Sequence, residues 1–158
     1  MRYILIDKVT EFEKSSFAIG FKQTDLSDEI FLDHFPGFPV FPGAMIIEAC
    51  AQLSGFLLEM SSNKAESPPK RAMLVQIEKS KFLKPIWGGE KIVVKSVLEN
   101  LIETGGRTYN EVFVGENKVA VSYLQFKFQM LNQEVLHIHR QDLYKKWTIG
   151  LNQNLVIK

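Results

Sequence analysis

The chain has 158 residues, a formal net charge of +1, and 46% hydrophobic and 11% aromatic residues. These values fit one globular domain with a sizeable core, and the small net charge gives no electrostatic argument for binding nucleic acid. The single cysteine, Cys50, excludes an internal disulfide and fits a reducing compartment. No apolar run is long enough for a secretion signal or for a membrane span of ~18 residues, so we expect a soluble cytoplasmic protein.

Two short strands are predicted in the amino-terminal part of the chain. Residues 3–9 are rich in β-forming side chains, and residues 16–22 alternate Phe and Ile with small or polar residues. Residues 25–33 are mostly polar and predict a loop. The segment that follows contains three prolines spaced three residues apart, which predicts a stiff loop.

A long helix is predicted over residues 44–60, because Ala, Leu, Met, Glu and Gln favour a helix and only Gly55 interrupts them. Pro42 and Gly43 stand at its start, where a proline is tolerated. The segment is apolar almost all round, which is typical of a helix buried on most sides. Such a helix needs other elements to wrap it.

The chain from residue 73 to residue 130 is predicted to supply those elements as strands. The first covers residues 73–83, and long strands are expected over 91–98, 108–114 and 118–130, separated by turns. We expect these four strands to form a meander. The whole pattern predicts an α+β fold, in which an antiparallel sheet of about five to six strands wraps one long central helix.

A histidine and a carboxylate lie on either side of the stiff loop. Imidazole titrates near neutral pH, so His34 suits a general base. Glu48 lies in an apolar segment, where a carboxyl is protonated more readily than in water and becomes a useful acid. Gln52 comes one turn after Glu48 on the same helix face and is placed to hold the carboxyl or a water molecule.

The motif His34-Phe-Pro-Gly, two residues, Val-Phe-Pro-Gly43, followed by Glu48-Ala-Cys-Ala-Gln52, resembles the signature of the β-hydroxyacyl-[acyl-carrier-protein] dehydratases of bacterial fatty-acid synthesis. The family has the same spacing of fourteen residues between histidine and glutamate. The resemblance extends from about Ile4 to about Phe128. It implies the hotdog fold, which agrees with the helix-and-sheet arrangement predicted above.

The resemblance also implies an activity. His34 and Glu48 would act as base and acid in removing water from a β-hydroxyacyl thioester, giving the trans-2-enoyl product. The N–H of Gly43 would bind the thioester carbonyl, and the carbonyl of Val40 would orient the histidine. No metal and no cofactor is implied, apart from the phosphopantetheine arm of the acyl carrier protein that carries the substrate.

The family is oligomeric, so the resemblance implies a homodimer or a trimer of dimers. Its active sites would lie at the dimer interface and combine the histidine of one subunit with the carboxylate of the other. Acyl carrier protein is acidic, and a basic strip beside the site would steer it. Lys79, Lys81 and Lys84 are candidates for that strip, with Arg71 as a fourth; the alternative is an ordinary solvated strand face.

Residues 131–158 lie outside the resemblance. Residues 142–147 predict a short amphipathic helix, and residues 155–157 predict an extended end. We therefore expect a single hotdog domain over residues 1–130 and a carboxyl-terminal extension, of unknown role, packed on or beside it.

Other activities on the same fold stay open at this point. They are a dehydratase that also isomerises the double bond, a hotdog thioesterase, and a non-catalytic subunit that binds acyl chains. The isomerising relatives have aspartate at the position of Glu48, and thioesterases lack the paired His and Glu. A scaffold has no use for a buried carboxyl that costs several kcal/mol. These arguments favour dehydration alone.

Overall fold

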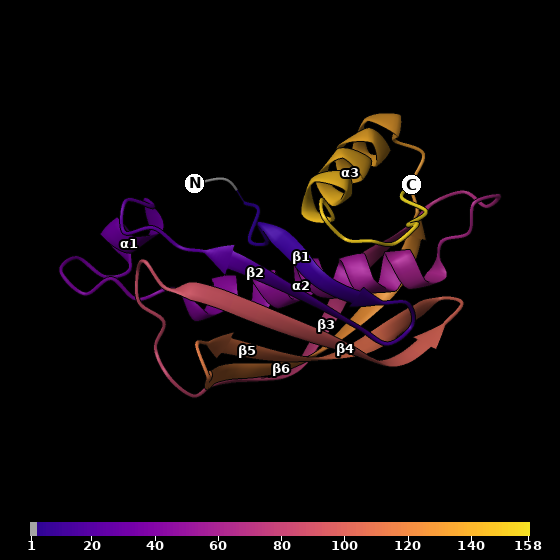
Figure 1. Cartoon of the computed structure of the whole chain (residues 1–158). Coiled ribbons are helices and arrows are strands. Elements are labelled where there is room, and N and C mark those ends of the chain that lie inside the picture. The colour runs from indigo at the N-terminus through magenta and orange to yellow at the C-terminus, as the bar shows by residue number, and fades with distance from the viewer. Residues whose placement is uncertain (1–2) are drawn as a thin grey trace.

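The computed structural model describes residues 3–158, which form one six-stranded antiparallel sheet and three helices (Figure 1). The strands are β1 (Lys8–Glu13), β2 (Phe17–Gln23), β3 (Lys70–Phe82), β4 (Lys91–Ile102), β5 (Gly105–Val114) and β6 (Asn117–Met130). The helices are α1 (Ile30–Asp33), α2 (Gly43–Ser62) and α3 (Glu134–Trp147). The first two residues of the predicted domain lie outside the described part of the chain.

The long helix α2 is the centre of the fold. It begins directly after Pro42, whose extended backbone lies just outside the first turn, and ends at Ser62. It packs against β2, β3, β4, β5 and β6. Its own side chains Leu53, Phe56 and Leu57 are fully buried, and each such side chain contributes about 1.5–3 kcal/mol on burial. This is the α+β hotdog arrangement, so the predicted fold class is confirmed.

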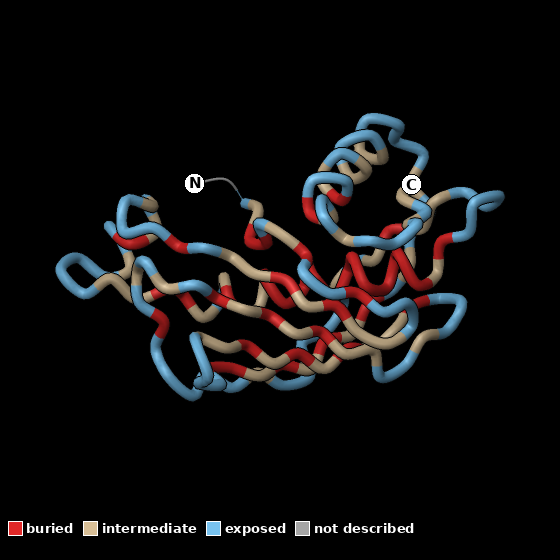
Figure 2. Tube along the Cα trace, in the orientation of Figure 1, coloured by how far each residue is buried: buried red, intermediate tan, exposed pale blue. Residues whose placement is uncertain are grey.

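The buried residues concentrate along α2 and the middle of the strands that face it (Figure 2). By length and composition α2 is apolar enough to cross a membrane, and it is the one such helix in the part of the chain described. Two thirds of its apolar stretch is buried inside the protein, as expected of a core helix.

The strand order is β1-β2-β4-β5-β6-β3, which corrects the predicted meander of four strands. β4, β5 and β6 do form a meander, but β3 pairs with β6 rather than with β4. After α2 the chain enters β3, which forms the sheet edge beside β6. The next strand, β4, lies inside the sheet and pairs with β2. Sequence periodicity contains no information about this choice of neighbour.

Two amino-terminal predictions are also corrected. The first strand begins at Lys8 and not at residue 3, because residues 3–5 cross α2 and bond to its side chain Gln52 instead of to a strand. Residues 25–33 are not all loop, since Ile30–Asp33 forms the short helix α1, which buries Phe31.

The carboxyl-terminal extension packs on the core. Its helix α3 is longer than the predicted residues 142–147 and lies above α2 and β1 (Figure 1). Tyr144 and Trp147 are buried at its end, and their rings meet Phe56 of α2 edge-on at 5.1 and 6.3 Å. Most of the outer surface of α3 is exposed (Figure 2).

Candidate active site

The loop between α1 and α2 fixes the imidazole of His34. Its Nδ1 lies 2.8 Å from the carbonyl oxygen of Val40, and the Val40 N–H donates to the His34 carbonyl at 3.0 Å. The ring of Phe35 stacks on the imidazole with centroids 4.2 Å apart. A carbonyl can only accept, so Nδ1 carries the proton whenever the ring holds only one. The lone pair of Nε2 is then available to take a proton.

His34 lines a pocket of about 300 Å³ at the start of α2, together with Gly43, Ile46, Phe82 and Lys84. The N–H groups of a first helical turn have no acceptor within the helix and lie at its positive end. A Cβ at Gly43 would come within 2.9 Å of the Phe82 ring, so glycine permits this close approach. A backbone donor, a histidine and an apolar wall therefore meet in one pocket.

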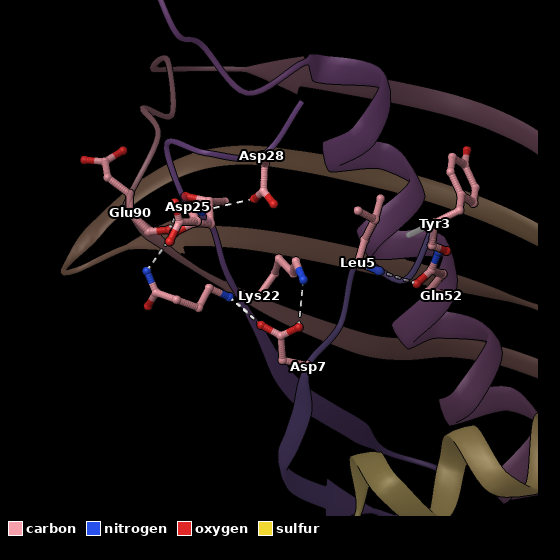
Figure 3. Close-up of polar contacts among 10 residues, drawn as sticks. Tyr3, Leu5, Asp7, Lys22, Asp25, Asp28, Gln52 and Glu90 are labelled. Carbon is pink, nitrogen blue, oxygen red and sulfur yellow. Dashed lines mark hydrogen bonds and ion pairs between the residues drawn. The ribbon is translucent and has the colours of Figure 1, made fainter. Parts of the chain in front are cut away.

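Glu48 is held by Gln52, one turn further along α2. The Gln52 Nε2 donates to the Glu48 carboxylate at 3.0 Å and to the Tyr3 carbonyl at 3.2 Å. Its Oε1 accepts the Leu5 N–H at 2.9 Å, which fixes the orientation of the amide. Figure 3 shows Gln52 reaching from the helix to the segment that contains Tyr3 and Leu5. The crossing of the amino-terminal segment thus locks the donor that faces Glu48.

Glu48 and His34 do not share a pocket within one chain. Glu48 lines a smaller pocket of about 160 Å³ whose walls include Gly55, Met73, Phe126 and Arg140. Neither the pocket of His34 nor that of Glu48 contains the other residue. A base and an acid from the same chain therefore face different spaces.

Two of the four basic candidates lie on the exposed face of β3. Lys79 and Lys81 are exposed, and because they are two residues apart in the strand their side chains lie on the same face. Lys84, also exposed, lines the His34 pocket and donates to Asn117 at 2.8 Å. The prediction for Arg71 is wrong, because its side chain is fully buried and pairs with Glu59 at 3.0 Å.

A buried ionic cluster around Glu59 is absent from the sequence predictions. The Glu59 carboxylate accepts hydrogen bonds from Arg71 at 3.0 Å, the Ala72 backbone N–H at 2.9 Å and the Tyr144 hydroxyl at 3.0 Å. Arg71 also donates to the backbone oxygen of Lys158 at 2.7 Å. Burial raises the pKa of Tyr144 well above its usual value, so the phenol remains a donor. This cluster ties the extension to α2 and β3.

A sequence signal for this cluster did exist. Glu59 lies in an apolar helical segment, as Glu48 does, and a carboxylate there needs a partner. Its partners come from β3 and α3, which the sequence does not place beside it.

Comparison with known proteins finds a matching family model and similar curated proteins. A family model described as a FabA-like domain matches residues 1–121. The 3-hydroxyacyl-[acyl-carrier-protein] dehydratase FabZ of Sulfurovum sp. (strain NBC37-1) is 33% identical over 129 residues, covering 78% of this chain and 85% of that protein.

Solved structures agree with the fold. The protein smu.793 from Streptococcus mutans UA159, bound to acetyl CoA, has a TM-score of 0.62 at 17% identity, covering 80% of this chain and 90% of that one. The thioesterase HI1161 from Haemophilus influenzae has a TM-score of 0.61 at 14% identity, covering 80% of each chain. At these identities the similarity shows a common fold alone.

Proposed function

The chain belongs to the FabA-like family, and from this premise we propose that it is a dehydratase acting on 3-hydroxyacyl chains carried by acyl carrier protein. The reaction removes water across the bond between Cα and Cβ and leaves the trans-2-enoyl thioester. The observation that carries the proposal is the imidazole of His34, held by Val40 beside the amino terminus of α2, in a chain that also supplies Glu48.

His34 is the proposed base. Its Nε2 takes the proton from the carbon next to the thioester carbonyl, while the Gly43 N–H stabilises the negative charge that develops on the carbonyl oxygen. The Val40 carbonyl accepts a hydrogen bond from the Nδ1–H and stabilises the imidazolium that forms. The Cβ–O bond then breaks, and Glu48 donates its proton to the departing hydroxyl, which leaves as water. The steps are two proton transfers and the loss of water, with no net oxidation or reduction, so the proposed reaction draws on no cofactor of its own.

Two copies of the chain would complete each site. His34 and Glu48 line different pockets, so the base of one subunit has to meet the acid of another. β3 offers an interface, because it is an edge strand of thirteen residues. Its side chains Met73, Val75 and Ile77 are 46–52% exposed. A long apolar edge of this kind readily pairs with another strand, and we propose a homodimer formed across β3.

Acyl carrier protein is the proposed partner at the His34 pocket. Lys79 and Lys81 lie on the strand that leads to Phe82 and Lys84 at the pocket wall. Their positive charge would attract an acidic carrier and orient the arm that delivers the substrate. We propose that the reaction takes place in the cytoplasm, because bacterial fatty-acid synthesis on acyl carrier protein takes place there.

The test is a hydration–dehydration assay with trans-2-enoyl and 3-hydroxyacyl chains of several lengths on a carrier protein, following enoyl absorbance. We expect turnover by the natural sequence, and a loss of about 10²- to 10⁴-fold in His34→Ala and in Glu48→Gln, with both variants folded by circular dichroism. No turnover at any chain length, from a folded protein, would refute the dehydratase. A His34→Ala protein mixed with Glu48→Gln should recover part of the activity if the two residues meet across a dimer.

A further inference from the structure

The pocket that begins at Glu48 follows one face of α2. Gln52 and Gly55, one and two turns after Glu48, line the same pocket of about 160 Å³. Glu48 and Gly55 are separated by about 10 Å along the helix axis. Met73 of β3 and Phe126 of β6 supply apolar walls. The pocket therefore extends from the proposed acid toward the carboxyl-terminal half of the helix.

Gly55 leaves part of this space empty. It is buried inside a helix of 20 residues, where glycine is less favourable than alanine because it loses more conformational freedom on folding. A Cβ at this position would meet no atom within 4 Å outside its own stretch of helix, so no packing contact among the described residues requires glycine. What the glycine provides is the space itself, which a molecule entering from Glu48 would occupy.

A guanidinium closes the far end of the pocket. Arg140 lies on α3, beyond the residues that match the family model, and its half-buried side chain lines the pocket. Its guanidinium carbon lies 5.7 Å from the ring centroid of Tyr144, and the hydroxyl of that ring donates to Glu59 at 3.0 Å. Glu59 comes one turn after Gly55. Arg140 therefore stands at the end of the pocket that is remote from Glu48.

The carboxylate of Glu59 is already supplied with donors. It pairs with Arg71 at 3.0 Å and accepts from the Ala72 N–H at 2.9 Å and the Tyr144 hydroxyl at 3.0 Å. Arg140 is a second guanidinium beside this carboxylate. It is charged at any physiological pH and has five N–H donors, so it can bind a further acceptor that reaches it through the pocket. A carboxylate suits this role, because it matches the guanidinium in a two-point contact.

We propose that Arg140 is a specificity-determining residue that binds a carboxylate at the far end of the acyl chain, so that the preferred substrate is a 3-hydroxyacyl thioester with an acidic terminus. This inference rests on the proposed function. The chain would start at Glu48, pass over Gly55 and end at the guanidinium. A chain that ends in a methyl group would place hydrocarbon against the donors of Arg140, which is unfavourable.

A second copy of the chain is the other candidate for the space over Gly55. The edge strand β3, proposed above as the dimer interface, contributes Met73 to the pocket wall. Helix packing against Gly55 would account for the open space, whereas an acidic acyl chain accounts for both the space and the guanidinium at its end. A substitution at Gly55 separates the two occupants.

The experiment measures binding of two saturated acyl thioesters of pantetheine, equal in length, one ending in a carboxylate and the other in a methyl group. Neither can gain or lose water, so calorimetry reports binding without turnover. The natural protein is compared with Arg140→Gln, which removes the charge, and Arg140→Lys, which retains it. Lys145→Gln, on the exposed surface of α3, is the matched control.

We expect the natural protein to bind the carboxylate-ended thioester at least about tenfold more tightly than the methyl-ended one. Arg140→Gln should abolish this preference, Arg140→Lys should retain part of it, and Lys145→Gln should retain all of it. If Arg140→Gln does not fold, Arg140→Met has the same expected result. Gly55→Leu should weaken binding of both thioesters, because leucine fills the space, and light scattering should show an unchanged number of copies.

Equal binding of the two thioesters by the natural protein would overturn the inference, as would a preference that survives in Arg140→Gln or falls equally in Lys145→Gln. A changed number of copies in Gly55→Leu would assign the space to a second copy and would also overturn it. Turnover is tested separately, with 3-hydroxyacyl chains of both kinds on a carrier protein. A natural protein that prefers the acidic thioester but dehydrates neither chain would refute the dehydratase and leave the binding role of Arg140 in place.

Discussion

Two carboxylates project from α2 about three turns apart and meet opposite surroundings. Glu59, near the end of the helix, is 1% exposed and accepts bonds from Arg71, the Ala72 N–H and Tyr144. Glu48, near the start, accepts one bond from a neutral amide, Gln52, and lines an open pocket.

The difference separates a structural carboxylate, Glu59, from the carboxylate proposed to be reactive, Glu48. Burial raises the pKa of Glu59, and Arg140, the Ala72 N–H, Arg71 and Tyr144 oppose that effect. Its oxygens are committed to fixed donors, so it connects β3 and α3 to the helix. Glu48 keeps lone pairs free toward the pocket that it lines. An apolar helical neighbourhood alone does not distinguish the two.

The largest expected effect tests this contrast directly. Glu59→Gln leaves the Arg71 guanidinium buried without its counter-charge, so we expect the free energy of unfolding to fall by about 3–5 kcal/mol. Glu48→Gln should change it by less than about 0.5 kcal/mol, because that site is open. Urea denaturation measures both. A folded Glu59→Gln protein should retain its turnover; loss of turnover at full stability would break the comparison.

Gln52→Leu should have the next largest effect. The substitution removes the donor to Glu48 and frees the Leu5 N–H and the Tyr3 carbonyl. As Glu48 donates its proton it becomes a carboxylate, and a hydrogen bond to a charged group contributes about 1.5–3 kcal/mol, so kcat should fall by roughly ten- to hundredfold. Steady-state kinetics with saturating substrate measures this. Gln133→Leu, at an exposed position just before α3, is the matched control and should leave kcat unchanged.

A smaller effect is expected from the three exposed lysines that lead along β3 to the His34 pocket. Reversing the charges of Lys79, Lys81 and Lys84 to Glu should raise KM for a carrier-bound substrate by about tenfold at low salt, with the difference shrinking as salt is added. The same variant should process a small pantetheine thioester normally. Lys64→Glu, in an exposed loop, is the control. An equal loss with the small thioester would mean that the lysines act on the pocket and not on the carrier.

The smallest effect on turnover is expected from substituting Cys50, which lies on the buried face of α2. Cys50 is 1% exposed, and burial raises the pKa of its thiol to about 12. The thiol is therefore protonated and shielded at pH 8. A maleimide reagent should label it only when denaturant opens the core, and Cys50→Ala should retain turnover. Rapid labelling of the native protein would show that this face is open as well.

The sequence by itself determined the features that depend on local pattern. Apolar composition predicted the central helix to within two residues at its end, and alternation predicted an α+β fold with an antiparallel sheet. The motif spacing selected His34, Glu48 and Gln52. The helix and fold-class predictions succeed because helix propensity and strand alternation are properties of neighbouring residues, while the roles of the three motif residues stay a prediction.

Only the tertiary structure decided which distant residues meet. It placed β3 at the sheet edge, removed Arg71 from the surface and paired it with Glu59. It also brought Arg140 from the extension into the pocket of Glu48. Strand order and ion pairing depend on contacts between segments far apart in the chain, where hydrophobic periodicity contains no information about the partner. The same apolar helix therefore holds one carboxylate that is ion-paired in the core and one that lines a pocket.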